Sequence, residues 1–269
     1  MSSVEKNTMK ILTDNPEKAK PKDTWESNPV VIRLEHLKKS FGSNEVLSDI
    51  TMTLREGENV VVLGRSGQGK SVAIKCIAGL LQQDEGSCIV FGEEVKTLPE
   101  NGLKNLRVKV GFLFQSGALY DSMTVRDNLA FPLTRVLKMN DDSEINSLVE
   151  EMLENVGLKD AINKMPAALS GGMRKRIGLA RTLIMKPQIM LYDEPTTGLD
   201  PITSKEISEL ILNMQKKYKT SSIIITHDIA CAKITGDRIL IMNDGEFIAE
   251  GTYEELEHSG NELVRSFFK

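Results

Sequence analysis

Short apolar runs rich in β-branched residues recur along the chain and predict a series of strands. We expect strands at residues 30–35, 46–54, 59–63, 108–114, 188–192, 221–226 and 239–242. The pair Asp244-Gly245 predicts a hairpin turn leading into a further strand at 246–249, because both turn positions tolerate a positive φ.

Patterns typical of helices alternate with these strands. Residues 72–81 predict a helix, and helix formers prevail between 122 and 183, where Leu148, Met152 and Leu153 are spaced for one apolar face. Strands that alternate with helices indicate an α/β protein with a mainly parallel sheet. The long helical stretch interrupts that sheet as an insertion.

The first 28 residues show no apolar period and are rich in Lys, Asn, Glu, Pro and Ser, so we expect a mobile polar tail there. No secretory signal is visible, and no apolar stretch approaches the roughly 20 residues that a membrane helix needs. If the protein serves a membrane process, we expect it to act from the cytosolic side through a partner.

Composition and charge narrow the class of protein. The 269 residues, 40% of them hydrophobic, are enough to bury a sizeable core. A net charge of -4 and a pI near 5.6 argue against a large basic surface for nucleic acid. Cys76, Cys88 and Cys231 lack paired spacing, which favours buried thiols in a reduced compartment over a metal or redox role.

A glycine-rich segment lies between the expected strand at 59–63 and the expected helix. Gly64-Arg65-Ser66-Gly67-Gln68-Gly69-Lys70-Ser71 matches G-x-x-x-x-G-K-[ST] at every position. The glycines let backbone N–H groups turn towards an anion, and the helix that follows directs its positive end at the same phosphates. We expect Lys70 to bridge the β- and γ-phosphates of a nucleotide and the Ser71 hydroxyl to bind Mg²⁺.

Two adjacent carboxylates, Asp193 and Glu194, follow the apolar run at 188–192. Neighbouring side chains on a strand diverge, so the two carboxylates can reach different targets. An acidic pair alone is typical of an exposed turn. After this run, and downstream of a phosphate loop, the pattern favours Asp193 in the Mg²⁺ shell and Glu194 as the general base for the attacking water.

Leu169-Ser170-Gly171-Gly172 precedes a helix that starts with basic residues, and N–H groups at a helix N-terminus form an anion site. Residues 64–71 already serve one nucleotide, so we expect this second element to contact ATP held by a second copy of the chain. Basic residues can also indicate nucleic-acid binding, but in this helix they favour a structural and phosphate-facing role. Together with residues 64–71 and the acidic pair, this segment resembles the ATP-binding cassette (ABC) family.

The resemblance covers residues 30–250 and implies an ATPase that binds Mg²⁺. The fold it implies is a RecA-like P-loop NTPase core with an N-terminal antiparallel β subdomain and an inserted α-helical subdomain. The expected cassette spans 29–269, with its core at 29–115 and 184–251, its helical signature subdomain at 116–183 and a C-terminal helical segment at 252–269. In this family two subunits sandwich two ATP molecules, and each site combines one phosphate loop with the opposite signature.

The resemblance also assigns residues for which spacing alone leaves a structural role open. Phe41 falls where the family stacks an aromatic ring on adenine, Gln115 where the Q-loop glutamine completes the metal shell, and His227 where the switch histidine contacts the γ-phosphate. Thr197-Gly198-Leu199-Asp200 resembles the D-loop, in which Asp200 communicates across the dimer. Met173 replaces the usual Gln, and because a thioether cannot donate a hydrogen bond, one polar contact near the partner's ribose is in question.

The expected site therefore has four groups of residues. The catalytic group is Lys70, Glu194 and His227, and the Mg²⁺ ligands are Ser71, Gln115 and Asp193. The expected contacts with ATP in the same chain are Phe41, Gly64, Arg65, Ser66, Gly67, Gln68, Gly69, Lys70, Ser71 and Val72. The expected contacts with the partner's ATP are Ser170, Gly171, Gly172 and Met173.

A narrower resemblance lies at residues 113–125 and 127–133, in the signature ending Gly-Gly-Met, and in Asp200-Pro201-Ile202-Thr203. These segments resemble the ATPase of Mce/Mla-type phospholipid transport systems. That resemblance implies a peripheral protein on the cytoplasmic side of the inner membrane, bound to an integral-membrane permease and an Mce-domain lipid-binding protein. Tyr120, Phe131 and Pro132 are then candidates to line the groove that receives the permease, or else they pack the helical subdomain.

Two other functions are compatible with a cassette of this size. A soluble cassette can act as a scaffold, for example in cofactor assembly, with no role in transport. An importer ATPase for amino acids or another small solute is the third possibility, although we expect such a protein to carry Gln in place of Met173.

Overall fold

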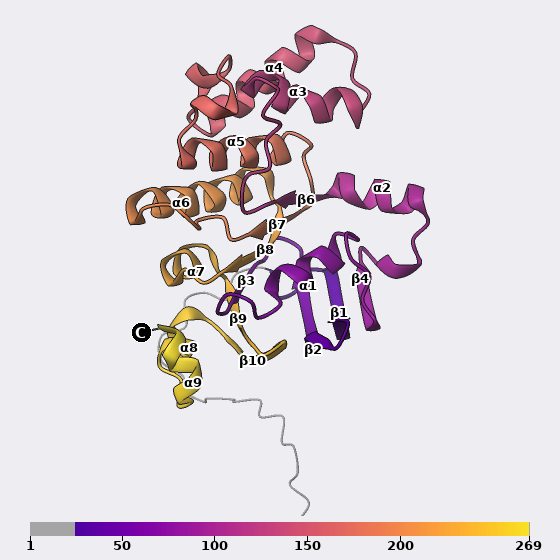
Figure 1. Ribbon diagram of the computed structural model, residues 1–269, viewed down its shortest axis with the longest axis vertical. Coiled ribbons are helices and arrows are strands. Elements are labelled where there is room, and N and C mark those ends of the chain that lie inside the picture. The colour runs from indigo at the N-terminus through magenta and orange to yellow at the C-terminus, as the bar shows by residue number, and fades with distance from the viewer. Residues whose placement is uncertain (1–24, 269) are drawn as a thin grey trace, which may run out of the picture.

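A single mixed sheet runs through the molecule in the computed structural model, which describes residues 25–268 (Figure 1). The expected tail at 1–28 therefore lies largely outside the described residues. In order along the sheet the strands are β5 (Glu93–Glu94), β4 (Glu85–Val90), β1 (Val30–Phe41), β2 (Asn44–Arg55), β10 (Glu246–Gly251), β9 (Arg238–Asn243), β3 (Asn59–Leu63), β8 (Ser221–Thr226), β7 (Ile189–Asp193) and β6 (Val110–Leu113).

The sheet has an antiparallel part and a parallel part. Strands β1, β2, β4 and β5 pair antiparallel, and β9 and β10 form an antiparallel hairpin. Strands β9, β3, β8, β7 and β6 pair parallel, so the carboxyl ends of these five strands lie at one edge of the sheet. The expected α/β fold, with an N-terminal antiparallel region beside a parallel core, is confirmed.

Helices cover both faces of the sheet and build a separate layer at one end. The helices are α1 (Lys70–Ile77), α2 (Glu100–Lys109), α3 (Val125–Arg135), α4 (Asp142–Asn155), α5 (Gly171–Leu183), α6 (Pro201–Tyr218), α7 (Ile229–Thr235), α8 (Tyr253–Glu257) and α9 (Glu262–Arg265). Helices α3, α4 and α5 gather at the end of the molecule furthest from the α8–α9 segment (Figure 1). No helix within residues 25–268 has the length and apolar character needed to cross a membrane.

The core strands are continuous apolar runs because both of their faces are covered. In β3, Val61 and Leu63 belong to one hydrophobic cluster, whereas Val60 and Val62 belong to the other. The first cluster includes residues of α3 to α7, and the second includes residues of α1 and of the antiparallel strands. Cys76, Cys88 and Cys231 are buried in these clusters, as expected from the sequence.

Several predicted boundaries were wrong for local reasons. The first helix begins at Lys70 and ends at Ile77, before Gly79 at φ +62°, and does not extend from 72 to 81. The strand expected at 108–114 is β6, at Val110–Leu113, because residues 108 and 109 are the last turn of α2. Strand β4 and helix α2 were not predicted. The hairpin prediction at Asp244-Gly245 is confirmed, with φ of 49° and 78°.

Candidate functional site

The glycine-rich loop connects the buried strand β3 to helix α1 in a conformation that needs glycine. Gly67 and Gly69 have φ of 85° and 95°, in the left-handed region that other residues rarely adopt. A Cβ atom on Gly69 would lie 2.6 Å from the carbonyl oxygen of Val46, so a side chain there would also collide with β2. The loop is further held by a hydrogen bond from the backbone N–H of Asp244 to Oε1 of Gln68.

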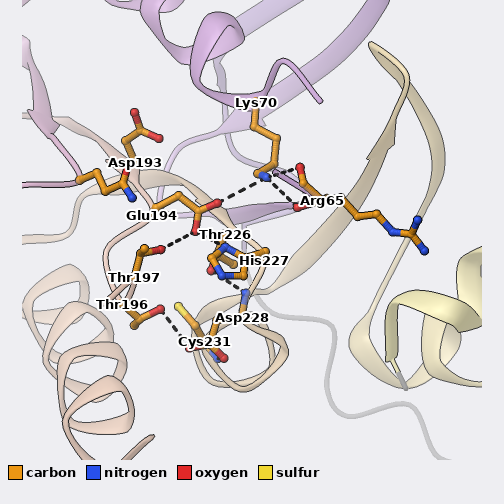
Figure 2. Close-up of polar contacts among 12 residues, drawn as sticks. Arg65, Lys70, Asp193, Glu194, Thr196, Thr197, Thr226, His227, Asp228 and Cys231 are labelled. Carbon is orange, nitrogen blue, oxygen red and sulfur yellow. Dashed lines mark hydrogen bonds and ion pairs between the residues drawn. The ribbon is translucent and has the colours of Figure 1, made fainter. Parts of the chain in front are cut away.

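The ammonium group of Lys70 lies inside this loop and close to a carboxylate (Figure 2). Its Nζ donates to the carbonyl oxygens of Gly64 and Arg65 at 2.6 and 2.9 Å, and lies 3.4 Å from Oε1 of Glu194. Burial lowers the pKa of Lys70, and the nearby Glu194 carboxylate opposes that shift. The strand β7 thus delivers a carboxylate to the phosphate loop, as the sequence predicts.

Glu194 is held by groups from two loops. Its backbone follows β7 at φ 50°, an unusual value for a residue with a side chain, and its N–H donates to the carbonyl oxygen of Ile225 at 2.9 Å. Oε2 accepts a hydrogen bond from the Thr197 hydroxyl at 3.0 Å and lies 2.8 Å from Nδ1 of His227 (Figure 2). The three predicted catalytic side chains, Lys70, Glu194 and His227, therefore meet at one carboxylate.

Ser71 and Asp193 form an oxygen-rich pair beside this carboxylate. The Ser71 hydroxyl donates to Oδ1 of Asp193 at 2.7 Å, which joins the start of α1 to the end of β7. Hydroxyl and carboxylate oxygens are the donors that Mg²⁺ prefers, so this pair fits the metal that the sequence predicts.

Two further predicted residues lie at strand ends without side-chain hydrogen bonds in the described structure. Phe41 ends β1 with 48% of its side chain exposed, and Nζ of Lys39 lies 5.4 Å from its ring centroid. Gln115 follows β6 and is exposed, and its backbone carbonyl accepts a hydrogen bond from Lys175. An exposed ring at the end of β1 is available to stack on a flat ligand, and the exposed Gln115 amide is available to a metal or to water.

The predicted signature lies away from the phosphate loop of its own chain. Ser170 caps α5, and its hydroxyl accepts the N–H of Met173 at 3.2 Å. Figure 1 shows α5 in the helical layer and α1 at the antiparallel part of the sheet, well separated along the long axis. Among residues 25–268, no hydrogen bond or ion pair joins the residues 170–173 to the residues 64–72.

The signature instead packs against the predicted D-loop. A Cβ atom on Gly172 would lie 2.7 Å from Cγ2 of Thr203, and one on Gly171 would lie 3.3 Å from Leu199. Asp200 caps α6 by accepting the N–H groups of Ile202 and Thr203 at 3.0 Å. The Thr203 hydroxyl also donates to Asp200 and lowers the pKa of its carboxyl group.

Sequence reasoning missed two residues that contact the site. Thr197 was expected only as part of the D-loop, yet its hydroxyl binds Glu194. Lys175 was grouped with basic residues expected to be structural or phosphate-facing, yet it is buried and donates to the backbone carbonyls of Gln115 and Glu194. A lysine on the same helix face as the apolar Gly178 and Leu179, three and four residues further on, is the sequence signal that could have identified it.

Comparison with known protein families and curated proteins gives consistent matches. Residues 47–197 match the family described as "ABC transporter". The chain is 40% identical over 249 residues to "Probable ribonucleotide transport ATP-binding protein mkl" of Mycobacterium tuberculosis, covering 92% of this chain and 69% of that protein. It is 37% identical to "Protein TRIGALACTOSYLDIACYLGLYCEROL 3, chloroplastic" of Arabidopsis thaliana (88% and 73%) and 38% identical to "Methionine import ATP-binding protein MetN" of Clostridioides difficile (84% and 70%).

Solved structures give the same result. The cbiO1 protein from Clostridium perfringens, described as part of the ABC transporter complex cbiONQ, matches with a TM-score of 0.78 and 28% identity over 88% of this chain and 94% of that one. The cassette MJ0796, solved as a dimer in a post-hydrolysis state with ADP and phosphate, matches with a TM-score of 0.75 and 30% identity over 82% and 98%. With these matches and the phosphate loop beside an acidic strand end, the chain belongs to the ABC transporter family and is an ATP-binding, ATP-hydrolysing protein of that family.

Proposed function

We propose that this ABC ATPase drives phospholipid transport, paired with a second copy of itself, an integral-membrane permease and an Mce-domain lipid-binding protein. The observation that carries the proposal is the segment 113–133 together with Met173, which resembles Mce/Mla-type ATPases. The similarity to the Arabidopsis thaliana protein TRIGALACTOSYLDIACYLGLYCEROL 3, which carries the name of a galactolipid, supports this proposal. In this proposal the protein binds peripherally at the cytoplasmic side of the inner membrane.

The proposed chemistry assigns one task to each side chain at the phosphate loop. Lys70 binds the β- and γ-phosphates through an ammonium group that already lies among loop carbonyls. Glu194 accepts the proton of the attacking water, and His227 and Thr197 hold its carboxylate in position. Ser71, Asp193 and Gln115 would hold Mg²⁺, which neutralises charge on the phosphate oxygens when it is bound.

The proposed dimer completes a site that one chain leaves incomplete. The signature residues 170–173 lie at the N-terminus of α5 and away from their own phosphate loop. A second chain brings its signature to the ATP on the first, and the dimeric MJ0796 cassette supports that arrangement. Met173 lies at this interface, where it offers no hydrogen-bond donor.

An exposed aromatic cluster at the start of the helical layer supports a permease-binding face. The rings of Tyr120 and Phe131 lie 5.0 Å apart, and 45% of the Tyr120 side chain is exposed. Phe114, just before Gln115, is 37% exposed. We propose that the permease binds at this face, because its contact with residues 114–120 reaches the loop that carries Gln115.

The importer alternative has its own support. The match to the methionine import protein MetN shows that this sequence is also close to a small-solute importer ATPase. The signature sequence favours phospholipid transport, because Met173 stands where we expect such an importer to carry Gln. The two proposals predict different membrane partners.

Isolation of the complex from native membranes tests the proposal. The tagged protein is purified after detergent solubilisation, and mass spectrometry identifies proteins and lipids that accompany it. We expect a multispanning permease, an Mce-domain protein and phospholipid. A permease with a solute-binding protein would favour the importer, and soluble partners alone would overturn the transport proposal. A Tyr120→Ala, Phe131→Ala variant serves as the control, because it should lose the permease while keeping the phosphate site.

A further inference from the structure

Lys175 is a buried lysine of the signature helix whose ammonium group donates hydrogen bonds to backbone carbonyls. Its side chain is 6% exposed, and it forms no ion pair with a carboxylate in the part of the chain that the structure describes. Burying an ammonium group is costly unless it is hydrogen-bonded. Here Nζ donates to the carbonyl oxygen of Gln115 and, at 3.1 Å, to that of Glu194.

The two acceptors belong to loops that follow neighbouring strands. Gln115 follows β6 and Glu194 follows β7, and these strands pair in parallel with Leu113 opposite Tyr192. Lys175 therefore reaches from α5 across the carboxyl ends of two adjacent strands. The same loops carry the proposed general base and one proposed metal ligand.

Close packing joins α5 to the first of these loops. A Cβ atom on Gly178 would lie 2.9 Å from the carbonyl oxygen of Gly117, and one on Gly117 would lie 3.1 Å from the carbonyl oxygen of Arg174. Glycines on both sides let the helix backbone approach the loop backbone. The hydrogen bonds of Lys175 add polar contacts where the backbone of α5 already packs directly against the backbone of the loop.

We propose that Lys175 is a positioning residue for ATP hydrolysis, which fixes the backbone carbonyls of Gln115 and Glu194 relative to the signature helix. This inference rests on the proposed role of Glu194. A movement of α5 would be transmitted through Lys175 to both loops together. Because Lys175 acts through backbone contacts, its loss changes the placement of the base and leaves the phosphate-binding loop intact.

The test compares Lys175→Met with Lys175→Arg in the full-length protein. Met keeps the length and apolar character of the lysine stem but donates no hydrogen bond, whereas Arg keeps both the charge and the donors. We expect kcat for ATP to fall between about 10- and 100-fold in Lys175→Met, since a small misplacement of catalytic groups has effects of that size. The dissociation constant for a fluorescent ATP analogue should change by less than about threefold, and Arg should restore at least part of kcat.

A merely structural role predicts a different pattern. In that case kcat per folded molecule stays normal, or it falls without rescue by Arg, and either result would overturn the inference. Lys104→Met is the matched control, because Lys104 lies on the exposed surface of α2 and pairs with Glu100 there. If Lys175→Met does not fold, Lys175→Leu replaces it, since Leu is also apolar and donates no hydrogen bond, and an unchanged kcat there would equally overturn the inference.

The Glu194→Gln variant separates this inference from the proposed function. Normal hydrolysis by Glu194→Gln would show that the base assignment itself is wrong. Loss of hydrolysis in Glu194→Gln together with a normal kcat in Lys175→Met would leave the base assignment standing and reject only the role of Lys175.

Discussion

Glu194 is the residue at which the polar contacts of the site converge, and its replacement by Gln isolates its proposed role as a base. Gln keeps the shape of the side chain and can still accept hydrogen bonds from Thr197 and His227, but it cannot take a proton from water. We expect turnover to fall by about 10²- to 10⁴-fold while ATP binding and dimer closure persist. Phosphate release, ATP binding and size-exclusion chromatography with ATP measure these three properties.

The matched control at the residue scale is Glu100→Gln. Glu100 carries the same charge, but its side chain is 84% exposed on α2 and pairs with Lys104. Turnover in this variant should equal that of the wild type. A normal hydrolysis rate in Glu194→Gln would remove Glu194 from the role of base and leave it as a partner of Lys70.

At the scale of elements, the helical layer depends on helix caps that the sequence encodes locally. Thr124 caps α3 in a capping box, where its hydroxyl accepts the N–H of Asp127 at 3.1 Å and donates to the Asp127 carboxylate at 2.7 Å. Thr124→Ala should lower the free energy of unfolding by about 1 kcal/mol. For a protein of this size that corresponds to a fall in Tm of roughly 2–4 °C, measurable by calorimetry.

Ser147→Ala provides the comparison within the same layer. Ser147 lies inside α4, and its exposed hydroxyl donates to the carbonyl oxygen of Ser143, so its loss should change the free energy of unfolding by less than about 0.5 kcal/mol. Equal Tm values for the two variants would mean that the capping box contributes nothing to the stability of α3.

The elements that could be predicted are those whose pattern is local. The runs that became β3, β7 and β8 are apolar on both faces, and the hairpin at Asp244-Gly245 has the residues its turn requires. Strand β4 was missed because it begins with the exposed Glu85 and Gly86, so that its apolar run is only three residues long. Helix α2 was missed because Leu106 is its one buried residue, so it has almost no apolar period.

The candidate site also has features that a local sequence pattern predicts and contacts that it does not. Its phosphate loop and acidic pair are contiguous motifs, so they could be identified from the sequence. The contacts that orient them, from Lys175 to Gln115 and from Thr197 to Glu194, join segments through tertiary packing and leave no regular spacing.

At the scale of the whole molecule, each ATP site is proposed to be shared between two chains. The ATPase rate of a heterodimer should then depend on whether two inactivating substitutions lie in different chains or in the same chain. Lys70→Ala disables a phosphate loop. Ser170→Asp keeps a good helix cap but places a carboxylate where the partner's phosphates should bind. A heterodimer with one defect in each chain has both defects in one site and the other site intact. A heterodimer of wild type with the double variant has one defect in each site.

These two heterodimers contain the same substitutions, so their comparison is internally controlled. Tandem purification with two different tags isolates each one for an ATPase assay. If the sites are shared and independent, we expect the heterodimer with separated defects to retain about half of the wild-type rate, and the one with a wild-type chain to be inactive. The reverse result, with activity following the intact chain, would show that each chain hydrolyses ATP with its own signature. In that case α5 would have to approach the phosphate loop of its own chain.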